Sequence, residues 1–155
     1  MKRNSKLLTL STVLMLAGCP TQQEWAQSLT GSWQGEKDGD GWCLTLQGPG
    51  TSEKGEGAAM YRSIIRKKAD PEFFHAEGIW YVGEGGRLQV NLYPVPLDEN
   101  FNPLTPTEYK TESFRYLIKS LEQDKLVYHE HTPKGEFGDL FASKRVGSCD
   151  QFFKS

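Results

Sequence analysis

The chain has 155 residues, a length that suits one compact domain. Its 18 basic and 20 acidic side chains give a formal net charge of −2, and the 137 residues after position 18 carry 15 basic and 20 acidic side chains, a charge of −5. An acidic excess argues against nucleic-acid binding, which needs clustered Lys and Arg, and against a polybasic attachment to anionic lipid headgroups.

The N-terminal segment combines three basic residues among its first six with a short apolar stretch at residues 7–17. This stretch is too short to span a bilayer as a helix, which needs roughly 20 residues. It ends in Leu16-Ala17-Gly18-Cys19, and this motif resembles the lipobox of bacterial lipoproteins. A small-residue run before a cysteine is the feature on which the resemblance rests.

The lipoprotein resemblance implies that the chain is cleaved before Cys19 and that this residue carries acyl chains on its thiol and amine. Residues 1–18 would then be a signal peptide, residues 19–29 a lipidated tether and residues 30–155 the folded domain. Pro20 stands where the family's inner-membrane retention signal would be Asp. We therefore expect a protein held by its lipid in the bacterial outer membrane, facing the periplasm.

Two cysteines remain once Cys19 is committed to lipid, and these are Cys43 and Cys149. The cell envelope outside the inner membrane permits disulfides, so we expect the two to be bonded. The alternative is a pair of unbonded, buried thiols. A redox pair is disfavoured because the sequence has no Cys-x-x-Cys spacing.

From Thr30 onward the sequence has the signals of β-structure, after one or two helical turns at residues 22–29. The predicted strands are residues 32–36, 42–47, 59–66, 73–82, 88–92, 114–118, 126–132 and 139–146. Glycine-rich turns are expected at residues 37–41 and 83–86, and a further turn at Asp70-Pro71. Four prolines predict a long loop at residues 93–106, on one rim of the fold.

About eight strands in sequential hairpins predict an all-β fold, a small antiparallel up-and-down barrel with a short N-terminal helical segment. The alternative is a two-sheet β-sandwich. Gly31-Ser32-Trp33 opens the first strand and resembles the Gly-x-Trp signature of lipocalin-like barrels. The resemblance implies that Trp33 plugs the closed end of a barrel and packs against a basic residue of the last strand, either Lys144 or Arg145.

Two patterns raise the possibility of a metal site. His129 and His131 are two residues apart and share one face of a strand, where they could hold a transition metal with His75 as a third ligand. Residues 36–41 have the acidic spacing of a calcium loop, but Gln47 stands where a bidentate Glu is needed. We favour surface histidines and a hairpin turn, and so expect neither a metal nor a cofactor.

Aromatic residues are frequent between residues 73 and 93, and in a strand they fall on both faces. Phe73 and Tyr81 face one way, while Phe74 and Trp80 face the other. Either one face is core and the other a contact surface, or a bulge at Gly78 resets the register.

No catalytic motif is present: the sequence has no Gly-x-Ser-x-Gly elbow, no His-Glu-x-x-His and no phosphate-cradling glycine loop. We therefore expect a non-enzyme. The first hypothesis is a lipid-anchored, lipocalin-like module that holds an apolar or amphipathic small molecule in the barrel. The alternative is an interaction protein of the periplasm, such as a pilotin, an assembly accessory or an inhibitor, that acts through an envelope protein. A cavity of about 300 Å³ or more would favour the small molecule.

Overall fold

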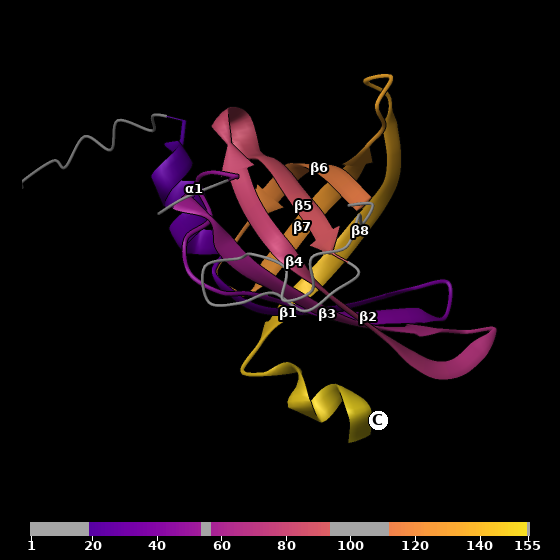
Figure 1. Cartoon of the computed structure of the whole chain (residues 1–155). Helices are drawn as coiled ribbons and strands as arrows, with labels where there is room; N and C mark the ends of the chain where they lie inside the picture. The colour runs from indigo at the N-terminus through magenta and orange to yellow at the C-terminus, as the bar shows by residue number, and fades with distance from the viewer. Residues whose placement is uncertain (1–18, 54–56, 94–111, 155) are drawn as a thin grey trace, which may run out of the picture.

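The structure, a computed structural model, describes residues 19–53, 57–93 and 112–154 (Figure 1). Its strands are β1 (Gly31–Lys37), β2 (Asp40–Leu46), β3 (Ala59–Lys67), β4 (Asp70–Gly83), β5 (Arg87–Tyr93), β6 (Glu112–Leu121), β7 (Lys125–His131) and β8 (Phe137–Val146). Helix α1 (Gln22–Leu29) precedes them, the 3-10 turn η2 (Glu84–Gly86) joins β4 to β5, and the 3-10 segment η3 (Cys149–Lys154) follows β8. The predicted signal segment at residues 1–18, and the predicted proline-rich loop beyond Tyr93, lie outside the described residues.

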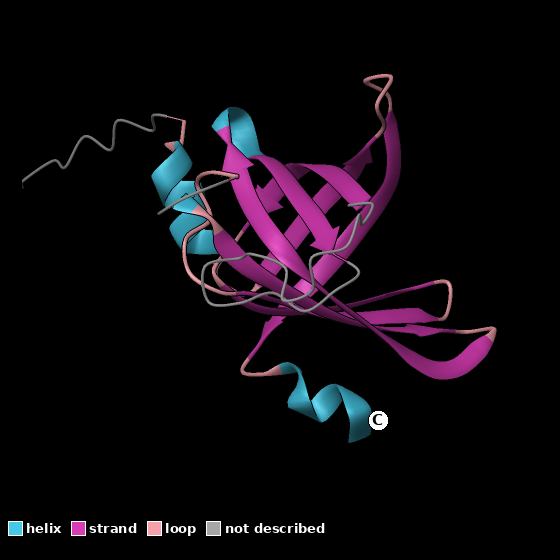
Figure 2. Cartoon of the chain, in the orientation of Figure 1, coloured by secondary structure: helices cyan, strands magenta, loops and turns pink. Residues whose placement is uncertain are grey.

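The strands pair antiparallel in sequence order, and β1 pairs with β8 as well as with β2, so the sheet closes into a barrel (Figure 2). The barrel and the short helix predicted from the strand pattern are confirmed, and the sandwich alternative is wrong. The hairpin between β1 and β2 turns at Asp38 and Gly39, whose φ angles are 56° and 92°. Positive φ at both central residues is the geometry of a type I′ turn, which suits the twist of the flanking strands.

Strand β4 starts earlier than the sequence predicts, so the turn expected at Asp70-Pro71 is wrong. The chain turns two residues before, at Lys68, whose backbone N–H donates to the Asp40 carboxylate at 2.9 Å. Pro71 fits within the strand because it has no partner on either side among the described residues: the β3–β4 pairing passes from Lys67–Asp70 to Arg66–Phe73, and residues 70–76 have no partner on β5. Proline is tolerated on such an edge, where its missing N–H leaves no ladder hydrogen bond unmade.

Pairing of β3 with β4 runs unbroken through Gly78, which lies opposite Tyr61. The bulge considered at Gly78 is therefore wrong, and the register shift lies between Arg66 and Lys67 instead. Glycine is required at position 78 for another reason: a Cβ there would lie 2.0 Å from the backbone oxygen of Asn91 on β5.

One end of the barrel is closed by α1 (Figure 1). The helix begins with a capping box, in which the Thr21 hydroxyl accepts from the Glu24 N–H and the Glu24 carboxylate accepts from the Thr21 N–H. The Gln22 amide then donates to the carbonyls of Thr51 at 2.7 Å and Val82 at 2.8 Å. These bonds hold the helix against β4. Leu29 of the helix is fully buried, as are Leu46, Trp80 and Val82 of the barrel.

Trp33 is fully buried at this closed end, and its indole N–H donates to the Leu29 carbonyl at 2.8 Å. The Arg145 guanidinium carbon lies 4.1 Å from the centre of the Trp33 ring. Arg145 also donates to three backbone carbonyls, those of Ser28, Thr30 and Gln123, at 2.6, 2.8 and 2.7 Å. Of the two basic candidates, Arg145 is therefore the one that contacts Trp33. Arg145 also explains why residue 31 is glycine, because a Cβ at this position would lie 2.7 Å from the Arg145 guanidinium.

We predict that Trp33→Ala lowers the free energy of unfolding by about 3–5 kcal/mol, since it opens a cavity in a packed core. Arg145→Met keeps an apolar stem but loses the charge and three donors, so we expect a loss of about 2–3 kcal/mol. Denaturant titration measures both values, and a double-mutant cycle gives their coupling. Lys144→Met is the matched control, because Lys144 is exposed on the same strand. If Arg145→Met lowers the free energy of unfolding no more than Lys144→Met does, the proposed role of the Arg145–Trp33 contact is contradicted.

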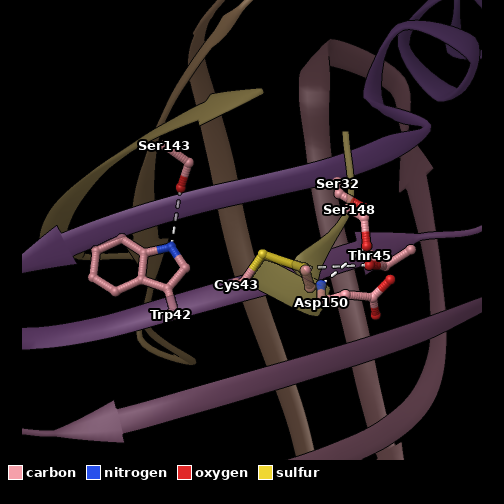
Figure 3. The surroundings of a disulfide bond; sticks show 8 residues. Ser32, Trp42, Cys43, Thr45, Ser143, Ser148 and Asp150 are labelled. Carbon is pink, nitrogen blue, oxygen red and sulfur yellow. Dashed lines mark hydrogen bonds between the residues drawn. A yellow bond between two sulfur atoms is a disulfide. The ribbon is translucent and has the colours of Figure 1, made fainter. Parts of the chain in front are cut away.

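The predicted disulfide between Cys43 and Cys149 is confirmed (Figure 3). It joins β2 to the start of η3, with a Cα–Cα distance of 5.6 Å and a sequence separation of 106 residues. Beyond it, Phe152 is buried against the outside of the barrel, with its ring 6.0 Å from that of Phe73. The bond and this ring contact hold the C-terminal segment on strands that begin the barrel.

We predict that replacing both cysteines by Ala lowers the free energy of unfolding by about 4–5 kcal/mol, because the bond closes a long loop in the unfolded chain. Denaturant titration of the variant measures this loss. Mass spectrometry of the non-reduced wild-type protein after alkylation supplies the check on the bond itself. Modification of Cys43 and Cys149 under native, non-reducing conditions would rule the bond out.

Candidate ligand-binding cavity

The barrel interior holds a cavity of about 370 Å³. Its lining includes residues of the hairpins that join β1 to β2 and β3 to β4, so it opens at that end of the barrel. Figure 1 shows these two hairpins on the side of the barrel opposite α1. Inward side chains of β2, β3 and β5 form one part of its wall: Trp42, Leu44, Leu46, Tyr61, Ser63, Ile65, Leu88 and Val90. The other part comes from β6, β7 and β8, with Tyr116, Leu126, Tyr128 and Phe141.

Alternation along each strand places these side chains inside, and a glycine makes room for the largest of them. Gly35 lies opposite Trp42 in the β1–β2 pairing. A Cβ at position 35 would lie 2.3 Å from the Trp42 ring, so the indole fits only because Gly35 has no side chain. The indole N–H donates to the Ser143 hydroxyl on β8 at 3.0 Å (Figure 3). Trp42 is thus held in place on the cavity wall.

Aromatic rings form one wall of the cavity. Trp42 meets Phe141 edge to face, with ring centroids 5.5 Å apart, and Phe141 stacks on Tyr128 at 5.4 Å. Tyr128 in turn meets Tyr116 edge to face at 5.3 Å. These are favourable arrangements for aromatic pairs, so the four rings support one another as a rigid surface. Such a wall suits a flat or aliphatic apolar ligand.

Three tyrosines bring hydroxyl groups into the cavity. Burial raises the pKa of Tyr61, Tyr116 and Tyr128 above the usual value for a phenol, and for Tyr128 hydrogen bonding from Ser143 and Trp42 acts in the opposite direction. Each phenol therefore stays neutral and able to donate a hydrogen bond throughout the physiological pH range.

Charged side chains line the cavity only near its opening, among the residues that the structure describes. Lys37 pairs with Asp139, and Lys67 pairs with Asp40, each with an N–O distance of 2.8 Å. The hydrogen bond from Lys67, together with that from the Lys68 backbone, lowers the pKa of Asp40. With Asp38, the rim holds two lysines and three aspartates, a formal charge of −1.

The structure does not bring the candidate metal ligands together. His129 and His131 lie on β7, with rings 5.4 and 6.0 Å from that of the exposed Phe137, while His75 lies on β4 opposite Ile64 of β3. The described part of the chain contains no group of three or more His, Cys, Asp or Glu residues that could hold a metal ion. Residues 36–41 form the hairpin between β1 and β2.

The apolar and aromatic residues of the cavity wall were not predicted as a site from the sequence. A signal was present for some of them, since Tyr116 shares its strand face with Ile118, and Tyr128 shares its face with Leu126. These patterns show which side of a strand is apolar. They do not show that the apolar sides of β3, β6 and β7 face a common space, because that depends on closure of the barrel.

Comparisons with known proteins name no family for this chain: no protein-family model matches it, and no curated protein matches it either. Function is therefore inferred from the cavity. Across residues 19–53, 57–93 and 112–154, none of the helices has the length and apolar character of a membrane span. Cys19 is exposed and not disulfide-bonded, three residues before α1 begins.

The buried tyrosines predict a loss of stability at alkaline pH. Tyrosines of the unfolded chain ionise near pH 10, while Tyr116 and Tyr128 keep their protons in the folded state at higher pH. Above about pH 10 the unfolded state therefore binds fewer protons, and the free energy of unfolding falls as pH rises. Below this pH the contribution of the two phenols is fully present.

Denaturant titration between about pH 9 and about pH 11.5 measures this dependence. The Tyr116→Phe/Tyr128→Phe variant removes both groups, so its stability should fall less steeply, by up to about 1.4 kcal/mol per pH unit for each tyrosine removed. Equal slopes in the variant and the wild type would contradict the burial of neutral phenols.

Proposed function

We propose that this protein binds an apolar or amphipathic small molecule inside its barrel. The observation that carries the proposal is the open volume of about 370 Å³. Small-molecule sites have volumes of about 300–1,000 Å³ with mostly apolar walls and a few polar groups that orient the ligand. A barrel filled with side chains would instead have favoured a role in protein contacts. The role proposed is binding without catalysis, because the polar groups around the aromatic wall are a serine hydroxyl and phenols whose pKa is raised by burial.

We further propose that the protein is a lipoprotein anchored through Cys19 in the bacterial envelope, with its domain in the periplasm. Cys19 is exposed and lies next to α1, which covers the closed end of the barrel. The cavity opens toward the β1–β2 and β3–β4 hairpins, and these hairpins lie opposite α1 in Figure 1. A lipid on Cys19 would therefore leave the opening directed away from the membrane surface, and a ligand would enter from the aqueous side.

Filling the cavity should abolish binding without unfolding the barrel. Val90 is buried on the cavity wall, so Val90→Phe places a ring in the open volume, and we expect affinity for uncharged naphthalene compounds to fall at least about tenfold. Val127→Phe is the matched control, because Val127 alternates with the buried Leu126 and Tyr128 and faces outward on β7. Calorimetric titration measures both affinities, and equal binding by the two variants would contradict a site in the barrel.

The anchor has its own test. Cys19→Ala removes the thiol that the lipobox resemblance makes the acceptor of the first acyl group, so the variant should accumulate as the unprocessed, unacylated chain. Mass spectrometry of the protein from membrane and soluble fractions distinguishes these forms. Recovery of a normally processed, membrane-bound species from the variant would contradict lipidation at Cys19.

A further inference from the structure

The polar groups that line the cavity are divided into two sets. Around the aromatic wall they are neutral hydroxyls, those of Tyr61, Ser63, Tyr116 and Tyr128, whereas the charged residues lie at the rim. Ser63 is 4% exposed and lies beside Tyr61, whose pKa its hydroxyl lowers by hydrogen bonding. Hydroxyls buried in this way carry a free-energy penalty wherever a donor or acceptor position is left unfilled, and a ligand can fill it.

The three phenols lie near one another. The rings of Tyr116 and Tyr128 meet edge to face with centroids 5.3 Å apart, and Tyr61 lines the same cavity from β3. The three phenols therefore line one cavity. Since burial keeps them protonated, this region offers several O–H donors and no positive charge.

An anionic group fits neither part of the cavity. Inside, a carboxylate would be removed from water without a cation to balance it, which is costly. At the rim, both lysines are already paired with aspartates, and the formal charge of the rim is −1. Lys37 also lies over the Phe141 ring, with its Nζ atom 5.2 Å from the ring centroid. An anionic headgroup would meet net repulsion there, or would have to break an existing ion pair.

We propose that the ligand is an uncharged molecule that is apolar over most of its surface and carries a hydrogen-bond acceptor such as a carbonyl. Inside the barrel this acceptor is bound by hydroxyl donors from the set Tyr61, Ser63, Tyr116 and Tyr128. This inference rests on the proposed function. The size of the ligand follows from the cavity, since about 370 Å³ corresponds to roughly a dozen water-sized groups. Fatty-acid-like anions are excluded by the charges, and the aromatic wall favours a flat, unsaturated or ring-containing body.

Three shape-matched naphthalenes test the proposal: 2-acetylnaphthalene, 2-ethylnaphthalene and 2-naphthoate. Calorimetric titrations use the full chain in phospholipid nanodiscs, with empty nanodiscs as the blank for partition into lipid. The ketone has the acceptor, the ethyl compound lacks it, and the carboxylate is anionic. We expect the ketone to bind about threefold to tenfold more tightly than the ethyl compound, the range of one neutral hydrogen bond, and the naphthoate to bind most weakly.

Variants assign the preference to the hydroxyls. The variant Tyr61→Phe/Ser63→Ala/Tyr116→Phe/Tyr128→Phe removes all four hydroxyls, preserves the rings and should bind the ketone and the ethyl compound equally. Tyr81→Phe is the matched control, because Tyr81 lies on β4 one residue from the inward Trp80 and so faces away from the cavity. This control should keep the preference for the ketone.

The outcomes separate this inference from the proposed function. If the naphthoate or the ethyl compound binds as tightly as the ketone, or if the variant that lacks all four hydroxyls keeps the preference, the barrel binds small molecules but the proposed ligand class is wrong. If none of the three compounds binds above the nanodisc blank, both proposals are overturned.

Discussion

The contact between Arg145 and Trp33 is the constraint on which the rest of this barrel depends. It joins the last strand to the first, where β8 and β1 must pair for the sheet to close. The same guanidinium donates hydrogen bonds to three backbone carbonyls near α1 and the β6–β7 turn, so it also helps to seal the end that the helix covers. Charge-assisted hydrogen bonds of this kind are about twice as strong as neutral ones. One side chain thus contributes to both closure and sealing, together with the β1–β8 pairing and the hydrogen bonds of Gln22.

Sealing one end determines where open volume can remain. Trp33 and Trp80 are both fully buried and fill the closed end, while the interior nearer the hairpins is left with its cavity. The aromatic wall there is held by its own contacts: Trp42 to Ser143, and Phe141 to Tyr128. A rigid wall around an unfilled space is preorganised for a ligand, which lowers the conformational cost of binding. The barrel therefore combines a structural end with an end suited to binding.

Much of the fold could be predicted because its signals are local. The helix at residues 22–29, the strand alternation and the resemblance carried by Trp33 each depend on a few neighbouring residues. The turn near Asp70 was misplaced because its position depends on Asp40, a residue from another hairpin that binds Lys68. The cavity could not be predicted at all. Its volume depends on how side chains from β2, β3 and β5–β8 fill a shared space, and on Gly35, which admits the Trp42 ring.

The central claim, a ligand site inside the barrel, is tested most directly by nuclear Overhauser effects between a bound, uncharged naphthalene and the methyl groups of the protein. The account predicts cross-peaks from the ligand to Leu88 and Val90, which line the cavity on β5. Exposed apolar residues on the outer face of the barrel, such as Leu140 on β8, should give none. Cross-peaks to Leu140 with none to Leu88 or Val90 would contradict it, and would place the ligand on the surface instead.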